Sequence, residues 1–233
     1  MNINVRMRKW LAVFLFVIAA AVVGAITLPS YFRTQKYRRW IEGKFVDAPA
    51  FLRRDGGNEQ VFERITPSQP KPAYDFQLTN MDNTTVRLAD YREKLLLMGF
   101  IYTSCPDVCG TITQHFLYIQ RRLAEEIGNN LALAFITTDP EKDTPERLSA
   151  YTKGYEGNWD FMTGTKTELE EVWEEYHVGV LDGRSESGTD LVYHSFMVVL
   201  IDRNGFIRHR YIGVVDPEEV IVKDIEMLLL ESS

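Results

Sequence analysis

The chain has 233 residues, 45% of them hydrophobic. It is therefore long enough for one globular domain of roughly 150 to 200 residues plus an appendage. Charge is unevenly distributed, since residues 1–44 carry a balance of +7 and the remainder a balance of −14. An acidic globular part lacks the basic face that binds phosphates, which excludes nucleic acid as a partner.

An uncharged run of 19 residues, Trp10 to Leu28, lies within the basic head of the chain. At about 1.5 Å per residue, a helix of this length crosses the hydrocarbon core of a bilayer. A cleaved signal peptide has a similar basic start, but its apolar core is shorter and a small-x-small cleavage site follows it. We therefore expect residues 1–9 to form a short basic cytoplasmic N-terminus and residues 10–29 a single-pass anchor. The globular part is expected on the extracytoplasmic side of a bacterial cell membrane.

Residues 30–72 contain many turn residues and little periodicity, which indicates a linker or covering segment. The compact domain is expected over residues 73–233. It starts with apolar residues that alternate with polar ones on both sides of a polar turn, a pattern typical of a β-hairpin over residues 76–88. The run "KLLLMGFIY" (94–102) is apolar throughout and has the length of a strand that is buried on both faces.

Helical and strand patterns alternate after this run. Residues 109–127 repeat apolar side chains every three or four positions, which predicts a helix, and "LALAFITT" (131–138) predicts a second buried strand. In "TPERL", Thr144 is a typical helix cap and Pro145 is favoured in the first turn. These residues predict a second helix.

The last third of the domain contains a third helix, two strands and a final helix. The third helix is expected over residues 167–176, and the final helix over residues 217–230. The strands "SFMVVLID" and "FIRHRYIG" flank Asn204-Gly205, a strong hairpin turn. The order of elements predicts an α/β fold in which helices flank a mixed sheet.

Cys105 and Cys109, the only cysteines, lie where the first buried strand gives way to a helix. The start of a helix lowers the pKa of a thiol, so we expect both sulfurs to ionise easily. On a continuous helix the two side chains would share one face at a separation that a disulfide accepts. The spacing permits a disulfide and a shared metal ion equally, whereas a structural staple around so short a ring would add little stability.

Two thiolates favour a soft ion, and Cu(I) with two sulfurs and one imidazole is a natural set of ligands. Of the four histidines, His115 lies six residues beyond Cys109 and faces away from the sulfurs. His177 ends a helix and complements its dipole, and His209 is expected to point from a strand to solvent. His194 follows the polar loop "LDGRSESGTD" and is the candidate ligand. The alternative for His194 is a hydrogen-bonded residue at a strand end.

Four motifs follow one another along the chain: "GFIYTSCPDVCG", "FITTDPEKDTPERLSAY", "FMTGTKTELEEV" and "VYHSFMVVLIDRNG". Together they resemble the Sco/SenC family, membrane-anchored and thioredoxin-like copper proteins needed to assemble cytochrome c oxidase. The resemblance covers residues 73–233 and the anchor, and it implies a thioredoxin-like domain after one transmembrane helix.

The resemblance also implies that copper, as Cu(I) or Cu(II), is bound by Cys105, Cys109 and His194. Asp139 of the "DP" motif matches a position close to the copper, although it is also typical of a turn before proline. This sequence departs from the family at Gly110, where the family often has proline. Glycine is less favourable than proline in the first turn of a helix, so a looser helix start is expected.

Two functions are therefore in competition. The first is a copper metallochaperone for the binuclear copper site of the oxidase, with the copper-containing subunit as its partner and other copper chaperones or thiol reductants as further partners. The alternative is a thiol-disulfide oxidoreductase that reduces the cysteines of that site, with Cys105 attacking and Cys109 resolving. A peroxidase is a weaker third candidate. His194 discriminates between the first two, because thiol exchange does not require it.

Overall fold

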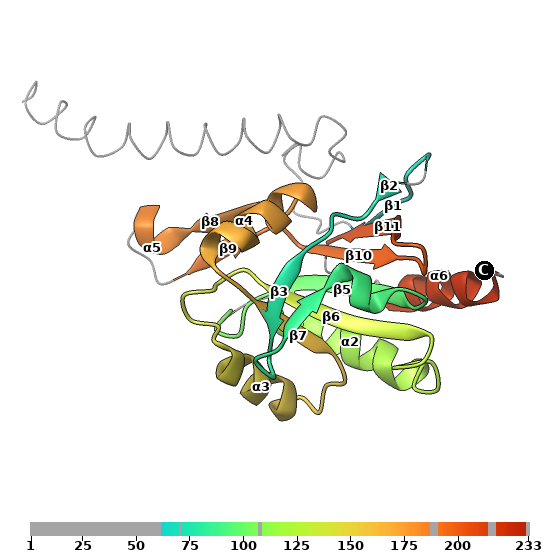
Figure 1. Ribbon diagram of the computed structural model, residues 1–233, viewed down its shortest axis with the longest axis horizontal. Coiled ribbons are helices and arrows are strands. Elements are labelled where there is room, and N and C mark those ends of the chain that lie inside the picture. Colours follow the sequence, from blue (N-terminus) through green and yellow to red (C-terminus); the bar gives the residue numbers. More distant parts are fainter. Residues whose placement is uncertain (1–61, 70, 107–108, 187–190, 214–217, 232–233) are drawn as a thin grey trace, which may run out of the picture. The chain divides into compact units, whose positions relative to one another are not determined.

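The computed structural model describes residues 62–69, 71–106, 109–186, 191–213 and 218–231 (Figure 1). The expected cytoplasmic N-terminus, the transmembrane anchor and most of the linker, residues 1–61, lie outside the described residues. Among the helices that are described, none combines the length and the apolar character needed to cross a bilayer.

A mixed sheet forms the centre of the described part. Its strand order is β1-β11-β10-β5-β6-β7-β3-β4, and β2 pairs with β11. The strands are β1 (Glu63–Ile65), β2 (Lys71–Pro72), β3 (Gln77–Asn80), β4 (Thr85–Arg87), β5 (Leu95–Ile101), β6 (Leu131–Thr137), β7 (Asp160–Thr163), β10 (Met197–Ile201) and β11 (Phe206–Ile212). β5, β6 and β7 are parallel, and every other pairing is antiparallel. A separate hairpin consists of β8 (Val180–Asp182) and β9 (Val192–His194).

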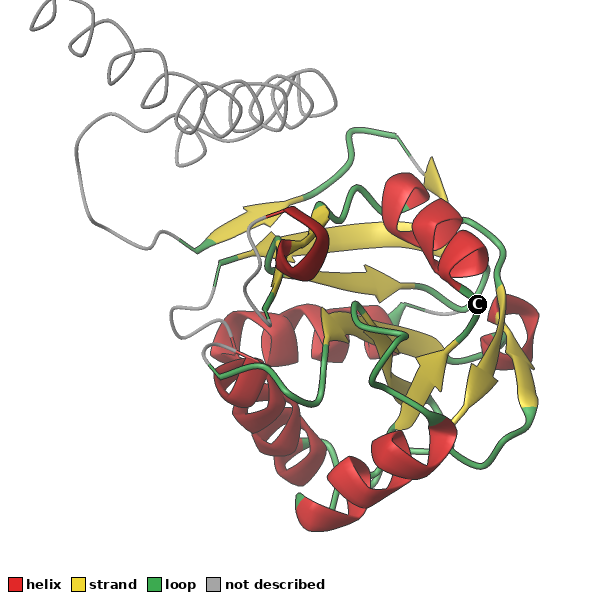
Figure 2. Cartoon of the chain, turned by 90° about the vertical axis from the view of Figure 1, so that its left-hand side faces the viewer, coloured by secondary structure: helices red, strands yellow, loops and turns green. Residues whose placement is uncertain are grey.

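Helices cover both faces of the sheet (Figure 2). They are the 3-10 helix η2 (Leu88–Tyr91), α2 (Cys109–Arg122), α3 (Pro145–Gly154), α4 (Lys166–Glu175), α5 (Gly183–Glu186) and α6 (Glu218–Leu230). Buried side chains of α2, α3 and α6 belong to one hydrophobic cluster, and those of α4 belong to the other. The fold is therefore an α/β sandwich with a mixed central sheet, as the sequence predicts.

β5 carries the core of both faces. All seven of its residues are buried, with Leu95, Leu97 and Ile101 in one cluster and Leu96 and Met98 in the other. Burial of one large apolar side chain contributes about 1.5 to 3 kcal/mol. β5 is therefore a rigid support for the loop that follows it, which contains Cys105.

Several predicted elements are confirmed. The N-terminal hairpin consists of β3 and β4, with Leu78 opposite Val86. The Thr144 hydroxyl caps α3 by accepting a hydrogen bond from the backbone amide of Arg147 at 3.4 Å. Gly205 adopts a φ of +80° in the turn between β10 and β11, a conformation that glycine tolerates best.

The sheet also reaches upstream of residue 73, where the compact domain is expected to begin. β1 pairs with β11, and Arg64 of β1 donates to the Asp224 carboxylate of α6 at 2.7 Å. Asp224 is fully buried and also accepts a hydrogen bond from the Tyr211 hydroxyl at 2.9 Å. The end of the expected linker is thus part of the folded structure. The short strands β1, β2, β7, β8 and β9 are not predicted from the sequence.

Candidate metal centre

Both cysteines lie at the junction between β5 and α2. Cys105 is half-buried in the connecting loop, whereas Cys109 is the first residue of α2 and is only 1% exposed. Both are free cysteines in the structure. The apolar strand and the amphipathic helix fix the two ends of the loop. The sulfurs therefore lie beyond the C-terminal end of β5, a central strand of the sheet.

His194 reaches this loop from 85 positions further along the chain. It ends β9, and its Nε2 lies 3.4 Å from the Cys109 sulfur. Its Nδ1 lies 3.1 Å from the backbone carbonyl oxygen of Ser195. A carbonyl oxygen only accepts, so Nδ1 carries the proton and Nε2 directs its lone pair toward the Cys109 thiol. This is the tautomer in which an imidazole binds a metal through Nε2.

Aromatic rings hold the imidazole in place. The Tyr102 and Phe196 rings lie edge-on to it, with centroid distances of 5.8 Å and 5.7 Å. The Tyr102 hydroxyl is hydrogen-bonded to the Cys105 side chain and to the backbone of Val192 in β9. Tyr102 therefore connects the cysteine loop to the hairpin that carries His194.

The structure corrects the expected acidity of Cys109. Its hydrogen bond with the Cys105 side chain, followed by burial, raises the pKa of the Cys109 thiol. The start of a helix lowers a thiol pKa, but here the neutral thiol is buried and hydrogen-bonded, and these effects outweigh the helix. The pKa of Cys109 is therefore higher than the sequence predicts.

Asp143 fixes the cysteine loop and is not identified from the sequence. Its buried carboxylate accepts hydrogen bonds from the backbone amide of Thr103 at 3.1 Å and from the Thr137 hydroxyl at 2.6 Å. The Thr103 hydroxyl is a third donor to it. Burial raises the pKa of Asp143, while the hydrogen bonds from Thr103 and Thr137 oppose that effect. The only local signal is its place before the helix cap Thr144, which is equally typical of an exposed residue.

Asp139 also lies at this end of the sheet, where it contacts a guanidinium. It is 1% exposed, and its Oδ1 accepts a hydrogen bond from Arg184 Nη2 at 2.8 Å. Its backbone carbonyl also accepts from the amide of Asp143 at 2.9 Å, the geometry of a turn. Asp139 thus has the expected turn geometry, and Arg184 is the partner that the sequence does not reveal.

The other three histidines lie on α2 (His115), after α4 (His177) and on β11 (His209). His115 Nδ1 lies 2.8 Å from Glu218 Oε2 of α6, consistent with the prediction that it faces away from the sulfurs. His209 is expected to face solvent; it is half-buried, and its Nδ1 lies 2.9 Å from the Thr66 hydroxyl at an exposed position. His177 does not suit a charged role at the helix end, since burial and the neighbouring Arg210 lower its pKa.

Two of the three predicted ligands, Cys109 and His194, are thus in contact, and Cys105 is hydrogen-bonded to Cys109. Within the described residues, no group of three histidine, cysteine, aspartate or glutamate side chains is arranged to hold a metal ion. The donor set itself, two sulfurs and one imidazole nitrogen, suits a soft ion such as Cu(I).

These features define a thioredoxin-like protein with a dithiol at the end of a central strand and a histidine supplied by a later hairpin. The chain belongs to the SCO1/SenC family, whose sequence profile matches residues 66–230. A SCO1 protein homologue of Bacillus subtilis is 29% identical over 156 residues, which cover 65% of this chain and 79% of the relative.

Solved structures agree with this assignment. The copper-bound structure of Bradyrhizobium japonicum ScoI is 26% identical, with a TM-score of 0.59 over 68% of this chain and 99% of that one. BsSco, a Sco-family cytochrome c oxidase assembly protein with a disulfide switch, is also 26% identical, with a TM-score of 0.61 over 72% of this chain and 99% of that one.

Proposed function

We propose that this protein is a membrane-anchored, extracytoplasmic copper metallochaperone that serves the binuclear copper site of cytochrome c oxidase. Its cargo would be bound by Cys105, Cys109 and His194. The observation that carries the proposal is the 3.4 Å approach of His194 Nε2 to the Cys109 sulfur. The copper-bound structure of Bradyrhizobium japonicum ScoI and the family membership support copper as the cargo.

The residues also suggest how copper would be loaded and kept. A thiol must lose its proton to bind copper, and the hydrogen bond with Cys105 and burial raise the pKa of Cys109, so loading is expected to release protons. Of the two sulfurs, that of Cys109 is buried, whereas Cys105 lies in the loop before α2 and is half-buried. Cys105 is therefore the sulfur that an incoming donor or the receiving subunit reaches first.

Anaerobic addition of one equivalent of Cu(II) to the reduced domain, residues 44–233, tests the proposal. We expect an intense thiolate-to-copper charge-transfer band in the wild type that weakens or shifts in His194→Ala. His115→Ala is the matched control, because this histidine is on the same helix as Cys109 but contacts Glu218. A band that is equal in all three proteins would exclude His194 as a ligand.

A thiol-disulfide oxidoreductase is the second candidate, and the hydrogen bond between the two thiols favours it. In this reaction the Cys105 thiolate would attack a partner disulfide, and Cys109 would displace the partner's second thiol. The partner gains two electrons and two protons, and the chain is left with a Cys105–Cys109 disulfide. The disulfide switch of BsSco supports such chemistry in this family.

Wild type and His194→Ala also distinguish the copper chaperone from the thiol-disulfide oxidoreductase. If copper only oxidises Cys105 and Cys109 to a disulfide without forming a stable band, thiol exchange becomes the primary function. If His194→Ala keeps both thiol exchange and full support of oxidase assembly in cells, the chaperone proposal fails. Loss of assembly with unchanged thiol exchange would instead favour copper delivery.

A further inference from the structure

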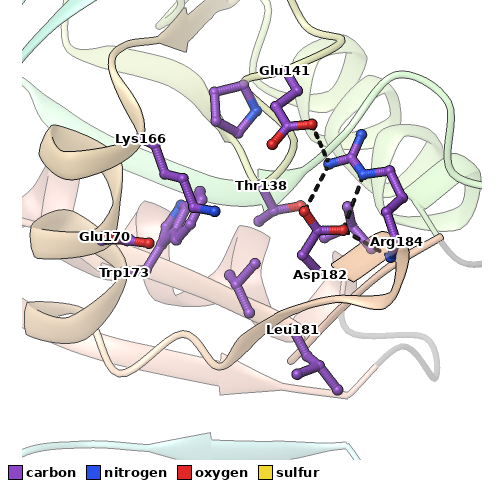
Figure 3. Close-up of a pocket in the computed structure, with 11 residues that line it drawn as sticks. Thr138, Glu141, Lys166, Glu170, Trp173, Leu181, Asp182 and Arg184 are labelled. Atoms are coloured by element: carbon purple, nitrogen blue, oxygen red, sulfur yellow. Dashed lines mark hydrogen bonds and ion pairs between the residues drawn. The ribbon is translucent and has the colours of Figure 1, made fainter. Parts of the chain in front are cut away.

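Arg184 joins two segments that are far apart in the sequence. Its guanidinium lies 2.8 Å from Asp139 Oδ1 in the loop after β6 and 3.0 Å from Asp182 Oδ1 at the end of β8. Glu141 lies 3.6 Å from the same guanidinium (Figure 3). One cation thus pairs with carboxylates on both sides of the boundary between the sheet and the β8–β9 hairpin.

The pair between Arg184 and Asp139 is shielded from water. The Arg184 side chain is 22% exposed and the Asp139 side chain is 1% exposed. A buried carboxylate without a partner is strongly unfavourable, so Asp139 keeps Arg184 close. Both Nη atoms face the carboxylate, at 2.8 Å and 3.4 Å, a forked geometry that also fixes the orientation of the guanidinium.

The hairpin that Arg184 holds is the one that carries His194. Asp182 pairs with Val192, and Val180 pairs with His194, so the two ends of the hairpin move together. This hairpin pairs outside the main sheet, and a two-stranded hairpin is only marginally stable alone. Its placement over the cysteine loop therefore depends on side-chain contacts such as the pair between Arg184 and Asp139.

We propose that Arg184 is a positioning residue for the candidate metal centre. Its ion pair with Asp139 clamps the β8–β9 hairpin onto the loop after β6 and thereby sets the approach of His194 to Cys109. This inference rests on the proposed copper-binding function. It also gives Asp139 a role that acts through Arg184 rather than through the metal.

The test compares R184Q, R184K and R208Q in the chain of residues 44–233. Arg208 is the matched control, because it makes a forked pair with Glu231 at 2.7 Å and 2.9 Å and is 32% exposed, but it lies on β11. Two quantities are measured. They are the hydrogen-deuterium exchange of the metal-free protein over residues 179–195, and the rate at which a Cu(I)-chelating dye removes copper from the loaded protein.

We expect R184Q to raise amide exchange selectively in the hairpin and to speed copper release about tenfold. R184K should restore part of both effects, because an ammonium keeps the charge but lacks the fork. R208Q should change neither. The double variant R184Q/D139N should release copper no faster than R184Q, since both changes remove the same contact.

The proposal is overturned if R184Q leaves hairpin exchange and copper release unchanged. It is also overturned if exchange rises equally throughout the domain, since that indicates only a general loss of stability. If the wild type binds no copper at all, the proposed function fails separately. The exchange measurement on metal-free protein then still decides whether Arg184 clamps the hairpin.

Discussion

Asp143 illustrates how single residues build this site. Its carboxylate receives three hydrogen bonds from Thr103 and Thr137 and fixes the loop that carries Cys105. Unlike a residue that touches a reactant, it acts on the candidate centre through the backbone of that loop. Asp143 is completely buried, so water cannot replace it as the acceptor for the donors of Thr103 and Thr137. Its loss should therefore destabilise the fold.

We expect Asp143→Ala to lower the free energy of unfolding by about 2 to 4 kcal/mol, because it leaves the amide and two hydroxyls of its partners without an acceptor. Urea denaturation of the metal-free protein measures this loss. Glu141→Gln is the matched control, since Glu141 lies in the same loop but its side chain is 57% exposed. Equal stability of Asp143→Ala and wild type would contradict the role of Asp143.

The lowered pKa of His177 makes the free energy of unfolding depend on pH. Burial, Arg210 and Lys71 lower its pKa in the folded chain, so the unfolded chain binds more protons as the pH falls below about 6.5. The contribution of His177 to the free energy of unfolding is therefore fully present above this pH. It declines as the pH drops toward the pKa of His177 in the folded chain. His209 contributes in the same direction, because burial lowers its pKa too.

Replacement by asparagine tests this effect, since asparagine does not titrate here and tolerates the φ of +61° at position 177. We expect the unfolding free energy of His177→Asn to fall less steeply than that of wild type between pH 7 and pH 5. Between pH 7 and pH 8 the two curves should run parallel. Equal slopes below pH 7 would show that His177 is not responsible.

At the scale of elements, β1 shows how a short strand becomes part of the domain. It has three residues and a sequence without clear alternation, yet it pairs with β11 and supplies Arg64 to the buried Asp224. Asp224 and Tyr211 are then joined across α6 and β11. Pairing with β11 and the ion pair with Asp224 stabilise β1. The intrinsic strand propensity of its three residues does not.

We expect a chain that starts at residue 73 to be about 3 kcal/mol less stable than one that starts at residue 44, because it leaves the Asp224 carboxylate without its cation. Thermal and urea unfolding of the two chains measure the difference. Arg64→Gln in the longer chain isolates the ion pair from the strand. A chain from residue 73 with undiminished stability would place β1 outside the cooperative unit.

At the scale of the whole molecule, the distribution of charge and hydropathy separates a basic, apolar head from an acidic globular part. The head lies outside the described residues. An anchor at residues 10–29 would keep the candidate metal centre near a membrane-bound partner.

We expect the full chain to remain in the membrane fraction after alkaline carbonate washing and the chain of residues 44–233 to be released. The reason is that 19 consecutive uncharged residues match the thickness of the hydrocarbon core. Protease added to spheroplasts should digest the globular domain if it lies outside the cytoplasm. A full chain that carbonate removes would contradict a transmembrane anchor.

Local patterns in the sequence determined much of this protein. The apolar runs predicted β5 and β6, the Thr144 cap predicted the start of α3, and Asn204-Gly205 predicted the turn between β10 and β11. Each depends on interactions between residues a few positions apart, such as a cap, a turn or a side-chain period. The resemblance to the Sco/SenC family also picked out both cysteines and His194.

Only the tertiary structure decided how these residues interact. His194 contacts Cys109 across 85 positions of the chain, and the pKa of that thiol is raised in the folded site. The buried carboxylates also have distant partners: Asp143 binds Thr103, 40 positions away, and Asp139 binds Arg184, 45 positions away. Chain folding sets such distances, and burial sets how strongly the groups act on one another. No local pattern contains either quantity, which is why the sequence identified the chemical groups and the fold determined their geometry.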